Sequence, residues 1–362
     1  MNWLRRLNRG ETNINFIRVW RYTMGVSAAL VIISILSLGV RGLNLGIDFT
    51  GGVSFEVKAP GVSVSDARSA LDKVGEGSAK IQIVGTDILR VQGPEATPEH
   101  LDEVRKTMAE LGNTDVANVN VSEVGASWGG DITRSAIRAL VFFFIAILIY
   151  LTIRLEWRMA VAAIVAVIHD VLISVGVYSV FQFEVTPGTV IAFLTILGYS
   201  IYDTIVVDDK IKENERLVGM SGRLTYSQMT SLSMNQVLLR SINTTVVSII
   251  PVISLLVVGA GIMGAVTLEE FSIALFVGLT VGAYSSVGVA APVLVWLKER
   301  EPKNRTIRER LAAQGADVTA SATRSIDSDE PADAAAPSGA RPTRAVTEGV
   351  IPPRPRKKSR KR

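Results

Sequence analysis

The sequence predicts an all-α membrane bundle of six transmembrane helices, with one α+β, ferredoxin-like extracytoplasmic domain inserted after the first span. Six apolar runs approach the length of about 20 residues that a helix needs to cross the hydrocarbon core. Between the first two runs lies a segment with the strand and helix signals of a folded aqueous domain. Of the 362 residues, 48% are hydrophobic and 20% are charged, and this charged fraction is below the ~25% typical of soluble domains. A membrane location follows from these observations.

The expected spans follow a short cytoplasmic N-terminus, residues 1–22. The first span, 23–42, has an apolar core longer than that of a signal peptide and no small-residue cleavage site after it, which indicates a retained anchor. Five further spans are expected within 132–300, at about 136–153, 159–181, 188–207, 244–262 and 271–297.

Charge is sorted along the chain, although the net charge is only +4. The four consecutive segments 1–41, 43–131, 132–297 and 298–362 carry +5, −7, −1 and +7. Because Lys and Arg near span ends mark the cytoplasmic side, both termini are expected inside and the acidic segment outside. This distribution excludes specific DNA binding as the main role, since the basic residues do not form one patch on a folded domain.

Residues 43–131 are expected to form the external domain. Ser63 can cap its first helix, with Asp66 three residues later, and Thr97 followed by proline opens a second helix that Gly112 ends. The elements alternate in the β-α-β-β-α-β order of a ferredoxin-like domain, at 53–57, 63–74, 80–84, 88–92, 97–112 and 117–124. We expect a stable domain without a catalytic site.

The last segment, residues 301–362, is rich in Ala, Pro, Ser, Thr and Arg and shows no periodic apolar face. Such a composition predicts a disordered basic cytoplasmic tail. Its polybasic end, 354–362, is expected to touch anionic membrane lipids, with docking on an acidic partner such as ribosomal RNA as the alternative.

Enzymatic chemistry has no support in the sequence. There is no cysteine and there are only two histidines, His100 and His169, so thiolate and histidine-rich metal sites are excluded. Phosphate-loop, zinc-protease and serine-hydrolase motifs are absent. We therefore expect no enzyme activity, no cofactor and no metal.

Ionisable residues within the spans are the main functional candidates, because a charge at membrane depth is costly without a role or a partner. Asp203 lies near mid-depth, and Arg240 is the nearest fixed cation by topology. A carboxylate that alternates between a proton and an arginine partner would be a proton-coupled switch. Further residues could form a proton relay: His169, Asp170, Tyr202 and Thr204.

Each of these residues also has a structural interpretation. Asp203 could make a structural hydrogen bond, and Arg240 could be a cytoplasmic anchor. His169 and Asp170 are adjacent and so point in different directions on a helix. In the last span, Gly278 and Gly282 form a G-x-x-x-G pair, which predicts close helix packing.

Several strings together resemble the SecD/SecF family of the bacterial Sec export machinery, within the resistance-nodulation-division superfamily. The similarity covers about residues 1–300 and includes the six-span order. It is carried by His169-Asp170-Val171, the string 240–245 and the motif residues Gly46, Asp48, Gly51, Gly52, Glu156, Trp157, Arg158, Gly198, Tyr199, Ser200, Asp209, Glu213 and Asn214. The chain departs from the usual family pattern at Tyr202, where Asn is common, and at Asp208, where Phe is common.

The resemblance implies a subunit that pairs with SecD beside the SecYEG channel, with YajC, and helps to pull preproteins across the bacterial cytoplasmic membrane after SecA has acted. It implies that the proton gradient drives this step, with Asp203 and Arg240 as the matching aspartate and arginine. Two alternatives stay open. One is half of a proton-coupled exporter of small molecules or lipids, and the other is a translocon scaffold that transduces no energy.

Overall fold

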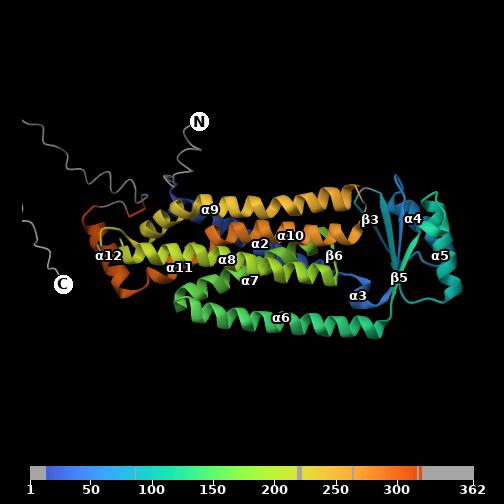
Figure 1. Cartoon of the computed structure of the whole chain (residues 1–362), viewed down its shortest axis with the longest axis horizontal. Helices are drawn as coiled ribbons and strands as arrows, with labels where there is room; N and C mark the ends of the chain where they lie inside the picture. The colour runs from blue at the N-terminus through green and yellow to red at the C-terminus, as the bar shows by residue number, and fades with distance from the viewer. Residues whose placement is uncertain (1–13, 86, 218–221, 263–264, 316–317, 320–362) are drawn as a thin grey trace, which may run out of the picture.

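Six long apolar helices form the body of the molecule in the computed structural model, which describes residues 14–85, 87–217, 222–262, 265–315 and 318–319. Each is long and apolar enough to cross a membrane, and they lie side by side along the long axis (Figure 1). They are α2 (Phe16–Arg41), α6 (Ala126–Arg154), α7 (Trp157–Phe181), α8 (Pro187–Leu217), α9 (Tyr226–Ser254) and α10 (Val266–Ser285). The predicted six-span class is confirmed.

Two of these helices continue through π-helical segments. After α9 comes η4 (Leu255–Ile262), and after α10 come η5 (Ser286–Ala290) and α11 (Ala291–Lys298). The fifth helix begins at Tyr226, well before the predicted 244, because Thr225 and Gln228 form a capping box and the polar first half is buried against neighbouring helices. A hydropathy pattern therefore misplaced this boundary, since it treats polar residues as lying outside the bundle.

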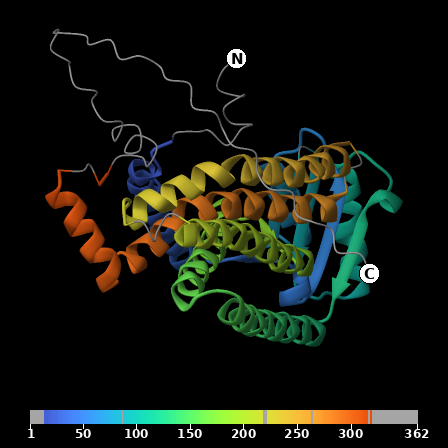
Figure 2. The same cartoon turned by 60° about the vertical axis from the view of Figure 1, so that its left-hand side comes forward.

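The centre of the bundle is built from α7, α8 and α10. In these three spans 50–56% of the apolar window is buried, against 6–11% in α2, α6 and α9, and α6 lies at the margin in both views (Figure 1, Figure 2). A Cβ atom on Gly278 would lie 2.5 Å from Ile196 Cδ1, and one on Gly282 would lie 2.9 Å from Ser200 Cβ. The predicted close packing of this glycine pair is thus confirmed, with α8 as its partner.

The external domain is a four-stranded antiparallel sheet with two helices on its far side (Figure 1). The sheet order is β3-β4-β2-β5, which is that of the predicted ferredoxin-like domain. Its elements are β2 (Gly52–Lys58), α4 (Val64–Leu71), η1 (Asp72–Val74), β3 (Lys80–Val84), β4 (Ile88–Gly93), α5 (Pro98–Leu111), η2 (Val116–Asn118) and β5 (Asn120–Val124).

Most of the predicted details of this domain hold, with two corrections. The Ser63–Asp66 capping box is present. The last strand begins at Asn120 rather than 117, because Asp115 caps a short 3-10 turn there. The domain also ends before 131, since α6 begins at Ala126 and runs unbroken into the membrane span.

A short connection ties the domain to the bundle. The two-residue strands β1 (Asn44–Leu45) and β6 (Glu184–Val185) pair in parallel, and α3 (Ile47–Thr50) follows β1. The motif glycines fit this crowded place. A Cβ on Gly46 would lie 2.6 Å from Glu184 Oε1, and Gly51 and Gly52 have φ of 75° and 120°, which favours glycine.

At the opposite end of the bundle from the external domain lies α12 (Pro302–Ala313) (Figure 1). The prediction of disorder from residue 301 is wrong for this helix. Glu301 pairs with Arg158, Arg310 bonds to the carbonyl of Gly222 and Leu311 is buried, so tertiary contacts hold a helix that its composition alone would not stabilise. The polybasic end 354–362 lies outside the described residues.

Candidate functional site

Asp203 is buried in the middle of the bundle and is held by serines. Ser241 Oγ of α9 donates to its two carboxylate oxygens at 3.0 and 2.8 Å, and Ser286 Oγ donates to Oδ2 at 2.6 Å. The side chain is only 6% exposed. Hydroxyl donors stabilise a buried carboxylate without adding a second charge, so Asp203 is held by hydrogen bonds rather than by an ion pair.

Asp170 of α7 forms a second carboxylate site of the same kind. Ser200 Oγ and Ser285 Oγ donate to its Oδ2 at 2.6 and 2.9 Å. His169 Nδ1 lies 3.1 Å from Oδ1, so the two adjacent side chains do meet, despite pointing from the helix in different directions. The structure therefore joins His169 and Asp170 into one unit.

The ring of His169 faces an aromatic neighbour, Tyr284, at 6.1 Å between centroids. Tyr284 hydroxyl donates to the carbonyl of Thr23 at 2.6 Å and lies 2.9 Å from Ser27 Oγ. His169 Nε2 is buried, and no described residue forms a hydrogen bond with it. The imidazole therefore contacts Asp170 through Nδ1 alone among the described residues.

The structure does not bring Arg240 to Asp203. Arg240 is exposed on α9, and no ion pair joins these two side chains within the described ranges, since Ser241 occupies that side of Asp203. Adjacent residues on a helix point about 100° apart, so α9 can present only one of the two to Asp203. The predicted arginine partner therefore faces away from the bundle in this arrangement.

The two remaining relay candidates, Thr204 and Tyr202, differ in burial, and two nearby residues have buried polar atoms. Thr204 is buried and donates to the carbonyl of Ser200 at 3.1 Å, whereas Tyr202 is 56% exposed and points out of the bundle. The Tyr199 hydroxyl and one oxygen of Asp208 are buried and have no hydrogen-bond partner within the part of the chain that the structure describes. Asp208, which stands where the family commonly has Phe, thus places an acid in the core. Tyr202, which stands where Asn is common, does not disturb the Asp203 site.

The motif residues near the α12 end form ion pairs. Lys298 Nζ, from a side chain only 4% exposed, donates to Glu156 Oε2 at 2.6 Å and also lies 3.4 Å from Glu215. This hydrogen bond lowers the pKa of Glu156. Arg158 stacks 4.5 Å over the ring of Trp157, which is exposed.

Four further motif residues tie helices together or lie away from the carboxylate sites. Asp209 accepts from Arg154 of α6 at 2.8 Å, and Asn214 donates to Ser233 and Gln236 of α9 at 2.8 and 2.9 Å. Glu213 makes a surface pair with Lys210. Gly198 has open space around it. Asp209 and Asn214 therefore join helices of the bundle, and among the described residues neither forms a hydrogen bond with Asp203 or Asp170.

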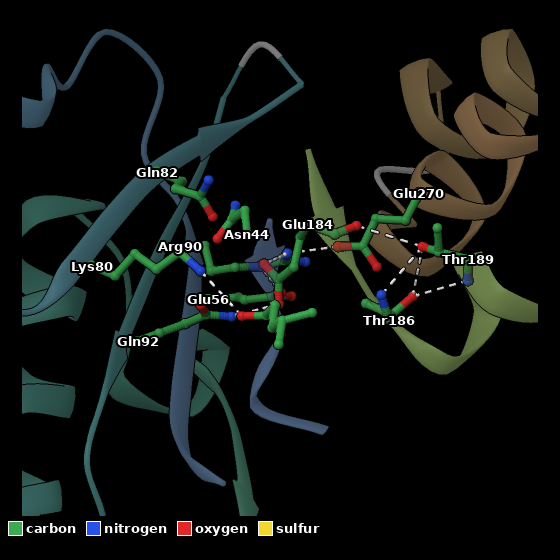
Figure 3. A network of polar contacts seen from close by, with 12 residues as sticks. Asn44, Glu56, Lys80, Gln82, Arg90, Gln92, Glu184, Thr186, Thr189 and Glu270 are labelled. Atoms are coloured by element: carbon green, nitrogen blue, oxygen red, sulfur yellow. Dashed lines mark hydrogen bonds and ion pairs between the residues drawn. The ribbon is translucent and has the colours of Figure 1, made fainter. Parts of the chain in front are cut away.

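A buried cluster joins the external domain to the bundle (Figure 3). Arg90 of β4 is at its centre, with Nη1 2.5 Å from Glu184 Oε2 and 2.6 Å from Glu270 Oε1, and Nε 2.7 Å from Glu56 Oε1. Gln92 adds a bond to Glu184 at 2.7 Å. We call Arg90, Glu56, Glu184 and Glu270 the Arg90 cluster. It links the sheet, β6 and the outer end of α10.

The electrostatics of the Arg90 cluster follow from three acids around one cation. Burial alone would lower the pKa of Arg90, but Glu184, Glu270 and Glu56 raise it above its ordinary value. Burial, together with the charge of Glu184, raises the pKa of nearby Asp48. Arg90 therefore stays charged at every physiological pH, while Asp48 binds protons more readily than a free carboxylate.

Sequence reasoning missed the serines that hold the two acids and the residues of the Arg90 cluster. Ser285 and Ser286 carry a weak signal, as adjacent hydroxyls in an otherwise apolar run, but serine is common in spans. Glu184 and Glu270 lie in the two short connections that lack Lys and Arg. Their partner Arg90 could not be named, because the pairing depends on how the domain docks.

A six-helix bundle with buried carboxylates and a docked external domain defines a multi-pass membrane protein of the transport type. Two family profiles match the chain. "Protein export membrane protein SecD/SecF, C-terminal" matches residues 103–300, and "SecD/SecF GG Motif" matches 36–59. The chain belongs to the SecD/SecF family, and is a bacterial multi-pass translocase subunit rather than an enzyme.

Curated relatives agree with this assignment. The chain is 41% identical to protein translocase subunit SecF of Streptomyces coelicolor over 91% of both chains. It is 32% identical to SecF of Escherichia coli O157:H7, over 86% of this chain and 96% of the relative. The exporter alternative finds no support among these relatives, which are named as protein translocase subunits.

The solved structure of SecDF from Thermus thermophilus, described as a translocon-associated membrane protein, has the same fold. The TM-score is 0.72 with 33% identity, covering 82% of this chain. This chain spans 41% of that longer protein. The shared fold includes the external domain between the first and second spans.

Proposed function

We propose that the chain uses proton uptake at Asp203 to assist protein export through the Sec channel, as one half of a complex with a SecD subunit. The observation that carries the proposal is the buried Asp203 carboxylate, which is held by neutral hydroxyls from two other helices. The carboxylate loses its negative charge when it binds a proton, and the hydroxyls that hold it carry no charge that would balance this change. That change alters the forces between α8, α9 and the sixth span.

Pairing with SecD is supported by the Thermus relative, a SecDF protein of which this chain matches 39%. It is also supported by the outer face of α9, where Arg240 is exposed beside apolar side chains such as Val247 and Ile250. An arginine at membrane depth is costly against lipid. A partner subunit that offers a carboxylate or a polar cavity to Arg240 would remove that cost.

The proposal includes an orientation in which the external domain lies outside the cytoplasmic membrane and both termini lie inside. Lys298, Arg158 and Arg154 lie near the α12 end, whereas the other end carries Glu184, Glu269 and Glu270. The positive-inside rule assigns the first of these ends to the cytoplasm. SecYEG, SecA, YajC and the preprotein are the further partners that this placement suggests, and the basic tail would contact anionic lipids.

The decisive experiment compares Asp203→Asn with the wild type in inverted membrane vesicles that contain the whole translocase. We expect the variant to fold and to co-purify with SecD, but to lose the part of late export that an uncoupler removes in the wild type. Asp131→Asn is the matched control, since Asp131 is an exposed carboxylate in a surface pair with Arg134.

Three outcomes would contradict parts of this proposal. Normal uncoupler-sensitive export by Asp203→Asn would exclude the coupling role of Asp203. Wild-type export that does not respond to the uncoupler would favour the scaffold alternative, because a scaffold needs no proton gradient. Failure to recover a SecD subunit with the wild type would contradict the partner.

A further inference from the structure

Two adjacent residues of the sixth span hold both buried acids. Ser285 Oγ donates to Asp170 Oδ2 at 2.9 Å, and Ser286 Oγ donates to Asp203 Oδ2 at 2.6 Å. Because neighbouring residues on a helix point in different directions, one turn of this span reaches two helices, α7 and α8. The two carboxylates are thereby linked through a single peptide unit.

Both of these serines have a second acceptor within their own helix. Ser285 Oγ lies 3.2 Å from the carbonyl of Gly282, and Ser286 Oγ lies 3.2 Å from the carbonyl of Ala283. A serine has one hydroxyl proton, which can rotate. Each therefore can donate either to its acid or to its backbone carbonyl.

The other two hydroxyls at the acids differ in this respect. Ser200 Oγ and Ser241 Oγ donate to Asp170 and Asp203, respectively, and among the described residues neither has an acceptor outside its acid. Ser200 and Ser241 are thus fixed donors, while Ser285 and Ser286 are the donors that can change partner.

The exchange of hydrogen-bond partners at each acid conserves every proton. When the carboxylate of Asp203 binds a proton, it becomes a donor, and Ser286 Oγ can accept from it while the proton of Ser286 turns to the carbonyl of Ala283. No covalent bond of the serine changes and the serine keeps its proton. The same exchange is open to Asp170, with Ser285 and the carbonyl of Gly282.

The backbone at this point is a junction between two helix types. Ser285 is the last residue of α10 and Ser286 is the first residue of the π-helical η5. Single π-helical turns inside helices are concentrated at functional sites, where the wider turn leaves room for a shift in the hydrogen-bond pattern. A rearrangement at Ser286 is therefore transmitted directly to Ser285.

We propose that Asp170 and Asp203 form one coupled proton-binding pair, joined by the adjacent hydroxyls of Ser285 and Ser286. The transport role of the pair rests on the proposed function, whereas the coupling itself does not. Asp170 becomes a second proton-binding group, and Ser285 and Ser286 are positioning residues. Among the described residues, the neighbouring titratable groups on the packed helices are His169 of α7, Tyr199 of α8 and Tyr284 of α10, while Arg240 of α9 faces away from the bundle.

The test is an infrared pH titration of the full chain in lipid membranes, which detects protonated carboxyl groups without requiring export. The Asp170→Asn and Asp203→Asn variants assign the two bands. We expect Asp203→Asn to move the midpoint of the Asp170 band by about one pH unit, a tenfold change in proton affinity, as befits an interacting pair. Asp170→Asn should move the Asp203 band in the same way.

The serine variants supply the specific control. In the Ser286→Ala background, Asp203→Asn should no longer move the Asp170 band, and Ser286→Thr, which keeps a hydroxyl, should restore the shift. If Ser286→Ala does not fold, Ser285→Ala makes the same test from the Asp170 side. An unmoved Asp170 midpoint in folded Asp203→Asn overturns the proposal, as does a full shift that persists without the hydroxyl.

The infrared titration separates the proposed coupling of Asp170 and Asp203 from the proposed proton-driven export. Coupled titration with uncoupler-insensitive export would leave the proton pair standing and contradict the export mechanism. Independent titration with proton-dependent export would contradict the pair and leave the mechanism standing.

Discussion

Arg90 of the external sheet and Glu270 of α10 lie 2.6 Å apart across the boundary between the external domain and the membrane bundle. The other end of α10 is Ser285, which bonds to Asp170. One uninterrupted helix, Val266–Ser285, therefore connects the buried carboxylates with the external domain. A displacement of α10 that follows protonation would reach the domain through the Arg90 cluster.

Arg90→Gln is expected to loosen the external domain from the bundle. The substitution leaves the buried acids Glu184 and Glu270 without their cation, and breaking a buried pair in this way costs about 3–5 kcal/mol. We expect a lower Tm in detergent and faster hydrogen exchange in β1 and β6, measured by mass spectrometry. Glu270→Gln is the matched variant, and it should cost less, because Arg90 keeps Glu184 and Glu56. Equal hydrogen exchange in Arg90→Gln and the wild type would exclude the Arg90 cluster as the contact that holds the external domain on the bundle.

Gly282→Ala is expected to push α8 and α10 apart at the level of Asp170. The new Cβ would meet Ser200 Cβ at 2.9 Å, so the hydrogen bond from Ser200 to Asp170 must lengthen, and overpacking of this kind costs about 1–3 kcal/mol. Gly198→Ala on α8 is the control, since nothing lies within 4 Å of its Cβ position. That control should be neutral or slightly stabilising, because alanine favours a helix. Thermal melts of both variants test this expectation. Equal Tm values for Gly282→Ala and Gly198→Ala would contradict the close contact between Gly282 and Ser200.

Sequence patterns predicted those parts of the fold that depend on local signals. The Ser63–Asp66 capping box and the strand at Lys80–Val84 were placed correctly, because caps and alternation act over a few residues. The pairing of β1 with β6 was not predicted. Two-residue strands carry no periodicity, and their partners are far apart in sequence.

The candidate site likewise contains residues that the sequence predicted and partners that it did not. Asp203 and Asp170 stand out in the sequence, since an acid in an apolar run is rare. Their hydrogen-bond partners do not stand out. Whether α9 presents Arg240 or Ser241 to Asp203 depends on a rotation of about 100° about the helix axis, and hydropathy does not determine that rotation. The helix α12 was missed for a related reason, as contacts to Arg158 and Gly222, which are distant in sequence, stabilise it.

Asp48→Asn is expected to stabilise the docked domain at neutral pH. Burial raises the pKa of Asp48 in the folded protein, so folding favours its protonated form, and the stability gained from that form is lost as the pH rises through the raised pKa. Asparagine mimics the neutral acid. The gain in Tm over the wild type should therefore be largest at neutral pH and should shrink as the pH falls below the ordinary aspartate value. A gain that does not change with pH would exclude titration of Asp48 as its cause.

Glu156→Gln is expected to destabilise the α12 end in a pH-dependent way. The hydrogen bond from Lys298 lowers the pKa of Glu156, so the ionised form stabilises the fold above the ordinary glutamate pKa, and this contribution is lost as the pH falls through the lowered value. Wild type should therefore exceed Glu156→Gln in Tm at neutral pH, and the two should converge in acid. Glu213→Gln removes a carboxylate from an exposed pair with Lys210 and should stay within about 0.5 kcal/mol of the wild type. Because both changes delete the same charge, a pH-dependent loss confined to Glu156→Gln assigns the effect to the buried ammonium of Lys298, and an equal loss in both variants would assign it to net charge instead.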